Sequence, residues 1–135
     1  TMYFADSPTK NVFAYDYDAS TGSISNRRVF FHVDDENGVP DGHAPDEQGH
    51  IWQAIFGCGK VLRISPEGKV VAEVSLPTRC TSCPGFAGDD LYITSAEEEQ
   101  PDDFPDSVKH QGNLFKCHVG VKGAKLYRFK FATKE

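Results

Sequence analysis

The chain repeats one pattern of short apolar and aromatic segments three times along its length. The segments MYFADS (2–7), HIWQAI (50–55) and DLYITS (90–95) have the same shape. Each is followed, after a loop, by a matching segment: NVFAYDY (11–17), GKVLRIS (59–65) or GNLFKCH (112–118). Alternating, aromatic-rich runs of this length are typical of half-buried strands. No window of about 11 residues carries a helical stripe, so the sequence predicts an all-β chain.

The spacing of the repeats predicts the architecture. A period of roughly 40 to 50 residues is the length of a four-stranded β-propeller blade, which gives about three blades here. Three blades cannot close a ring, which typically needs about 4 to 8, and the open ends would expose apolar sheet faces. Either two copies pair, or the chain is part of a longer protein. The second is favoured, because the sequence begins inside a strand-like run.

Strands and turns can be placed from the pattern. Turn signals are densest at 18–22, 46–49, 66–68 and 88–90, and acidic loops occupy 34–38 and 97–111. Pro40-Asp41-Gly42 is also predicted to be a tight turn. The predicted strands are 2–6, 11–17, 24–33, 50–55, 60–65, 69–76, 91–96, 113–118 and 126–131.

Charge and hydropathy exclude several classes of partner. The net charge is −6, which disfavours nucleic acid and anionic membrane surfaces and suits a soluble enzyme or a site that holds a cation. No run approaches the roughly 18 apolar residues of a membrane helix. No secretory pattern opens the sequence, and a cytoplasmic location is expected.

The four cysteines do not form a zinc-site pattern. Only Cys80 and Cys83 make a CxxC, whereas a zinc ribbon needs a second pair or spaced histidines. Ordinary thiols in a reducing compartment are the favoured interpretation. A redox pair or a disulfide between Cys80 and Cys83 stays open.

Asp41 is the residue most strongly indicated for chemistry. Pro-Asp-Gly is a common turn on its own merits, so a structural role is the alternative. The predicted turn feeds the inner strand of a blade, which would put Asp41 at one mouth of the central channel. A carboxylate there can bind a divalent cation or accept a proton from water. His43 has no further ligands nearby in sequence and is expected to be packed or to face the channel.

Five stretches resemble the gluconolactonase/senescence-marker-protein (regucalcin) and luciferin-regenerating-enzyme family. They are MYFADSPTKNVFAYDYDASTGSISNRRVFF, VPDGHAPDEQGHIWQA, GCGKVLRISPEGKVVAEVSLP, TSCPGFAGDDLYITSA and GNLFKCHVGVKG, in that order. The resemblance implies a six-bladed propeller, of which residues 1–135 would be the C-terminal half of a single domain.

The resemblance also implies a metal site. Enzymes of this family hold one divalent cation in the channel, most often Ca²⁺, with Zn²⁺, Mg²⁺ or Mn²⁺ as substitutes. The ligands are a Glu near the N-terminus, an Asn before the strand that matches MYFADS, and the Asp of the PDG motif. Only the last has a counterpart here, Asp41, and the others would precede Thr1. His43, Ala44 and Pro45 depart from the family pattern, and Pro45 cannot donate a ladder hydrogen bond.

The function implied is metal-dependent hydrolysis of a sugar-acid lactone such as gluconolactone, with Asp41 as metal ligand and general base. One alternative is a non-catalytic calcium-binding or scaffold propeller. Another is that this chain alone is an inactive part of the enzyme.

Overall fold

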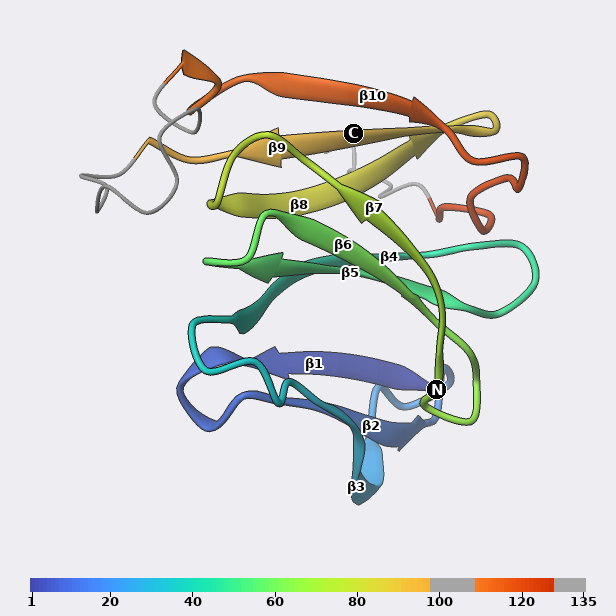
Figure 1. Ribbon diagram of the computed structural model, residues 1–135. Helices are drawn as coiled ribbons and strands as arrows, with labels where there is room; N and C mark the ends of the chain where they lie inside the picture. The colour runs from blue at the N-terminus through green and yellow to red at the C-terminus, as the bar shows by residue number, and fades with distance from the viewer. Residues whose placement is uncertain (98–108, 128–135) are drawn as a thin grey trace, which may run out of the picture.

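The computed structural model describes residues 1–97 and 109–127, which form three antiparallel sheets stacked one on another (Figure 1). The sheet orders are β1-β2-β3, β4-β5-β6-β7 and β10-β9-β8. The strands are β1 (Met2–Asp6), β2 (Asn11–Tyr17), β3 (Ile24–His32), β4 (Val39–Pro45), β5 (Ile51–Phe56), β6 (Lys60–Ile64), β7 (Val70–Ser75), β8 (Thr81–Ala87), β9 (Asp90–Ser95) and β10 (Leu114–His118). A short 3₁₀ turn, η1 (Ser7–Thr9), joins β1 to β2.

The alternating segments of the sequence are strands, as predicted. Eight of the predicted ranges agree with observed strands to within one residue at either end. In the ninth, 126–131, the first two residues lie outside any strand and the others fall outside the described residues. The three repeats occupy equivalent places, because β1, β5 and β9 each pair with the strand that follows them. The all-β prediction is therefore confirmed.

Two strands were not predicted. β4 (VPDGHAP) and β8 (TSCPGFA) are rich in proline and glycine, which normally mark turns. Both lie at the edge of their sheets, where a missing N–H removes no ladder hydrogen bond. β4 also packs beside β8, so these two strands bring the second and third sheets together.

The two central strands of the middle sheet, β5 and β6, are buried on both faces. Every residue of β5 except the last is buried. One side of the sheet contributes Trp52, Ala54 and Val61 to a cluster with Leu91 and Ile93 of the third sheet. The other side contributes Ile55, Leu62 and Ile64 to a cluster with Val33, against which Phe30 and Phe31 of β3 pack. Trp52 is a core residue, with 3% of its surface exposed.

Asp46 ties the β4–β5 turn to the core. The turn predicted at 46–49 is present, with Gly49 N donating to Asp46 O at 3.0 Å. The Asp46 side chain is fully buried. It accepts hydrogen bonds from the backbone N–H groups of Gln48 and His50, from Trp52 Nε1 at 3.1 Å, and from Arg63 Nε and Nη2 at 2.9 and 2.7 Å. This buried carboxylate is therefore fully hydrogen-bonded.

No disulfide joins Cys80 to Cys83 in the structure; Cys80 is buried and Cys83 is exposed. Within the described residues, no helix has the length and apolar character needed to cross a membrane.

Candidate functional site

Asp41 lies in a β-bulge of strand β4. The ladder with β5 shifts register between Pro40, which pairs with Ile55, and His43, which pairs with Gln53. Asp41 and its neighbour Gly42 fall in the gap. The predicted tight turn at this position is therefore wrong, because the edge position of β4 lets proline sit in a strand. Bulges of this kind change the direction of a side chain next to active sites.

Pro45, the departure from the family pattern, does not disrupt the strand. It pairs with Ile51 at the end of β4. Its carbonyl accepts a hydrogen bond from Ala124 N at 3.0 Å. The irregularity in β4 is thus confined to the bulge that carries Asp41.

Gln53 holds the bulge from within the core. Its side chain is completely buried, and Nε2 donates to the carbonyl oxygens of Asp41 at 2.9 Å, Gly42 at 3.2 Å and Ala54 at 2.9 Å. Carbonyls in a bulge lose their ladder partners, and a buried side-chain donor replaces them. The sequence reading missed this role. The available signal was one amide residue inside the otherwise apolar run IWQAI.

The Asp41 side chain is exposed. Among the described residues, no lysine or arginine forms an ion pair with it. Desolvation by the surrounding protein raises the pKa of Asp41, and a hydrogen bond from the Gly42 N–H partly offsets this effect. A carboxylate with a raised pKa is a stronger proton acceptor and is open to a cation.

Cys83 of β8 lies against the bulge. A methyl group on Gly42 would approach Cys83 Sγ to 2.5 Å, so glycine is needed there for the two strands to pack this closely. Desolvation and the negative charge of Asp41 raise the pKa of the Cys83 thiol. The sulfur beside Asp41 is therefore a neutral thiol at neutral pH.

His43 is packed rather than displayed as a ligand. Its ring contacts Tyr3 edge-on, with 6.4 Å between ring centroids. Burial lowers the pKa of His43, and the side chain of Gln53 partly opposes this shift. Nδ1 is buried without a hydrogen-bond partner. His43 also lines a cavity of about 490 Å³ with Pro45, Pro84, Phe86 and Leu126.

The bulge presents a single carboxylate, that of Asp41. Within residues 1–97 and 109–127, Asp41 does not belong to any group of three His, Cys, Asp or Glu donors close enough to share an ion. Calcium takes six to eight oxygen ligands. The charge and exposure of Asp41 fit a hard cation, and a complete site requires ligands beyond those described.

Replacement of Gln53 by Met is expected to destabilise the protein. Methionine keeps the volume but removes the donor from three carbonyl groups, and each buried unsatisfied group costs about 1–3 kcal/mol. Urea denaturation measures the loss. As a control, Ser75→Ala removes an exposed hydroxyl that donates to Glu73 and should have an effect within about 0.5 kcal/mol. Equal stability of the Met variant and the wild type would contradict the role assigned to Gln53.

Known proteins match most of the chain. Residues 1–97 match the family described as SMP-30/Gluconolactonase/LRE-like region. Regucalcin of Danio rerio is 41% identical over 134 residues, which cover 95% of this chain and 45% of the relative. Regucalcin of Xenopus laevis is 38% identical over 128 residues, covering 91% of this chain and 43% of the relative.

Two solved structures are also similar. A calcium-binding protein, regucalcin, of Agrobacterium tumefaciens superposes with a TM-score of 0.81 at 34% identity, covering 94% of this chain and 45% of that one. A luciferin-regenerating enzyme superposes with a TM-score of 0.78 at 36% identity, covering 91% and 43%. The chain spans less than half the length of these relatives. It belongs to the SMP-30/gluconolactonase/LRE-like family.

Proposed function

We propose that this chain contributes Asp41 to a metal-dependent lactonase that hydrolyses a sugar-acid lactone such as gluconolactone. The observation that carries the proposal is the exposed Asp41 carboxylate, held on a bulge by Gln53 and without an ion pair to any described lysine or arginine. Membership of a family described as gluconolactonase-like supports the reaction type. The substrate is a small molecule, and no nucleic acid or membrane is involved.

Asp41 has two roles in the proposed mechanism. It provides one oxygen ligand to a divalent cation, for which Ca²⁺ is preferred and Zn²⁺, Mg²⁺ or Mn²⁺ can substitute. When bound, the cation polarises the lactone carbonyl and acidifies water. Asp41 takes a proton from the water that attacks the carbonyl carbon. The bond from that carbon to the ring oxygen then breaks, and the ring oxygen receives the proton to give the hydroxy acid.

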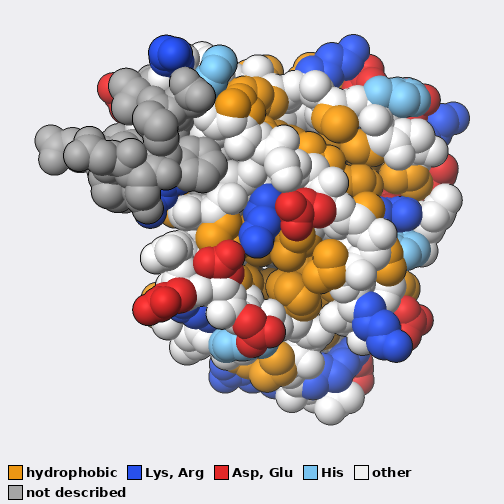
Figure 2. Space-filling view, in the orientation of Figure 1, with side chains coloured by type: hydrophobic (Ala, Val, Ile, Leu, Met, Phe, Trp, Pro, Cys, Tyr) orange, Lys and Arg blue, Asp and Glu red, His pale blue; other side chains and the backbone are white. Residues whose placement is uncertain are grey.

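The remaining ligands are proposed to lie in protein outside these 135 residues. We propose that the chain is the C-terminal half of a six-bladed propeller. In the described residues, β1 has no strand on its outer edge, unlike the equivalent β5, which pairs with β4. Phe4 of β1 is 49% exposed, and apolar side chains gather near the middle of the face seen in Figure 2. A preceding strand along β1 would complete that sheet.

The cytoplasmic location expected from the sequence stays a prediction.

The chain on its own is expected to bind calcium only weakly, with a dissociation constant of about 10⁻⁴ M or higher, since one carboxylate replaces few of the ion's water ligands. It is also expected to show no turnover of gluconolactone. Isothermal titration with CaCl₂ and a pH-stat assay measure both, with the full-length protein as the positive control. Rapid hydrolysis by the 135-residue chain would contradict the proposal.

A calcium-binding propeller without catalysis is the second candidate. It is favoured by the similarity to a protein named as a calcium-binding regucalcin. The two candidates differ in one measurement on the full-length protein. Calcium binding that depends on Asp41, with no hydrolysis of any lactone tested, would support the second.

A further inference from the structure

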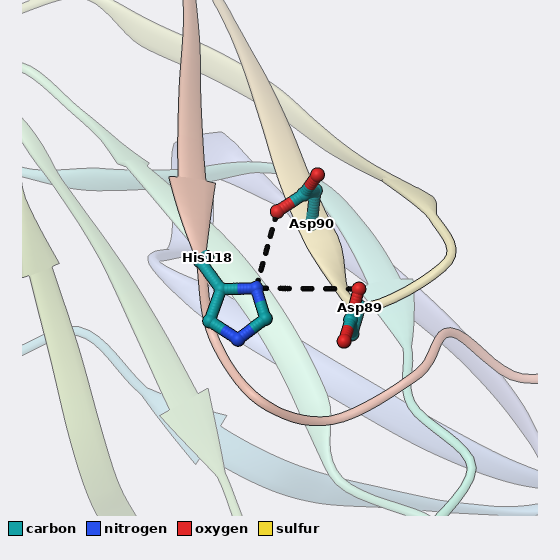
Figure 3. A group of neighbouring side chains, drawn as sticks. All are labelled: Asp89, Asp90 and His118. Carbon is teal, nitrogen blue, oxygen red and sulfur yellow. Dashed lines mark hydrogen bonds and ion pairs between the residues drawn. The ribbon is translucent and has the colours of Figure 1, made fainter.

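A second group of metal-binding side chains lies on the third sheet. Figure 3 shows the imidazole of His118 pointing at the carboxylates of Asp89 and Asp90. His118 Nδ1 is 3.2 Å from Asp90 Oδ1 and 4.0 Å from Asp89 Oδ1. One donor atom from each of the three residues lies within 4.8 Å of the other two. This spacing lets one ion contact all three donors.

The backbone fixes all three positions. Gly88 and Asp89 form the two-residue turn between β8 and β9, which Ala87 and Asp90 close as a ladder pair. Gly88 has a φ of +67°, a conformation that glycine adopts readily in such turns. On the neighbouring strand, His118 pairs with Asp90 in the β9–β10 ladder, and Val119 N donates to Asp89 O at 3.1 Å. The donors therefore come from a short hairpin and from a strand that is hydrogen-bonded to it.

The charge of the group favours a cation. Lys116 Nζ contacts Asp90 Oδ2 at 2.7 Å, the oxygen that His118 does not contact. Two carboxylates thus lie beside one ammonium group and one imidazole. The side chains of Asp89 and His118 are 53% and 66% exposed, which leaves room for water ligands.

We propose that Asp89, Asp90 and His118 bind a transition-metal ion of the Zn²⁺ class, with water completing the coordination. An imidazole nitrogen together with carboxylate oxygens suits Zn²⁺, Co²⁺ or Ni²⁺, whereas Ca²⁺ prefers oxygen ligands alone. The ion would link the end of β10 to the β8–β9 turn. This site is separate from Asp41. Gly42 contacts Cys83 near the start of β8, and Asp89 follows the end of that strand.

The test is a titration of the protein with ZnCl₂ by isothermal calorimetry and by thermal melting. It uses an Asp41→Asn background, so that the result does not depend on the proposed lactonase site. One Zn²⁺ per chain and a higher melting temperature are expected. His118→Ala and Asp89→Asn should each weaken binding at least about tenfold and remove the thermal shift, as expected for the loss of a ligand. Lys116→Met should tighten binding, because it removes a competing positive charge.

His32→Ala is the matched control. His32 is also exposed, and it lies 4.0 Å from a single carboxylate, that of Asp34, so its removal should leave zinc binding unchanged. Zinc affinity that is the same in the His118, Asp89 and His32 variants would overturn the proposal, as would the absence of saturable binding. The side chains of Asp89 and His118 are exposed, and circular dichroism is the check that their variants are folded.

Discussion

Replacement of Asp41 by Asn is expected to reduce kcat/KM for gluconolactone by about 10³-fold or more in the full-length protein. The general base alone contributes about 10²–10⁴-fold, and the same change removes the charge of a metal ligand. The fold should be unaffected, because Gln53 binds the main-chain carbonyl of Asp41 and not its side chain. Steady-state hydrolysis at saturating Ca²⁺ measures kcat/KM, calcium titration measures the affinity for the ion, and a thermal melt measures the stability of the fold.

The control for this variant is Glu73→Gln. Glu73 is an exposed carboxylate on β7, and its side chain contacts the hydroxyl of Ser75. Its neutralisation should leave hydrolysis unchanged. If Asp41→Asn kept the wild-type rate and calcium affinity, Asp41 would be neither base nor ligand. A loss of rate with normal calcium affinity would assign Asp41 as the base and contradict its role as a ligand.

Much of the fold could be predicted, because most strands are short runs rich in apolar, β-branched and aromatic residues between turn residues. The NVFAYDY segment (11–17) and the KVLRI segment (60–64) are examples, each with three buried residues. β4 and β8 could not be predicted in this way. Their prolines and glycines resemble turn residues, and the edge position that accepts them becomes visible only once the sheet is assembled.

The candidate site could be predicted only in part, because its local structure depends on contacts between strands that are distant in sequence. Asp41 stood out as a carboxylate next to glycine, but its local structure is a bulge and not a turn. The support from Gln53 depends on the register of β5 against β4, which the local sequence does not encode. The approach of Cys83 depends on contact between strands of two different sheets. Residues that act through neighbours distant in sequence are therefore the ones that pattern analysis misses.

Asp46→Asn is expected to lower the free energy of unfolding by about 3 kcal/mol, because it leaves Arg63 without its carboxylate in a largely buried site. Desolvation works to raise the pKa of Asp46, but the hydrogen bonds from Arg63, the His50 N–H and Trp52 outweigh it, and the pKa is lowered. A lowered pKa means that the charged form stabilises the fold. This stabilisation is complete above the unfolded pKa of about 4 and is lost as the pH falls through the folded value.

The pH dependence separates this ionic contribution from a packing defect. Urea denaturation at pH 7 should show the full difference between wild type and Asp46→Asn, and the difference should shrink below about pH 4 as the wild-type carboxylate is protonated. Asp16→Asn breaks an ion pair with Arg28 in which both side chains are exposed, Asp16 by 55% and Arg28 by 43%. This replacement should change the free energy of unfolding little at any pH. A difference for Asp46→Asn that stays constant down to pH 3 would mean that shape, and not charge, makes Asp46 necessary. In that case the turn that follows β4 would depend on the hydrogen bonds that the side chain of residue 46 accepts from the backbone N–H groups of Gln48 and His50. Adding Arg63→Met to the Asp46→Asn variant would then recover no stability.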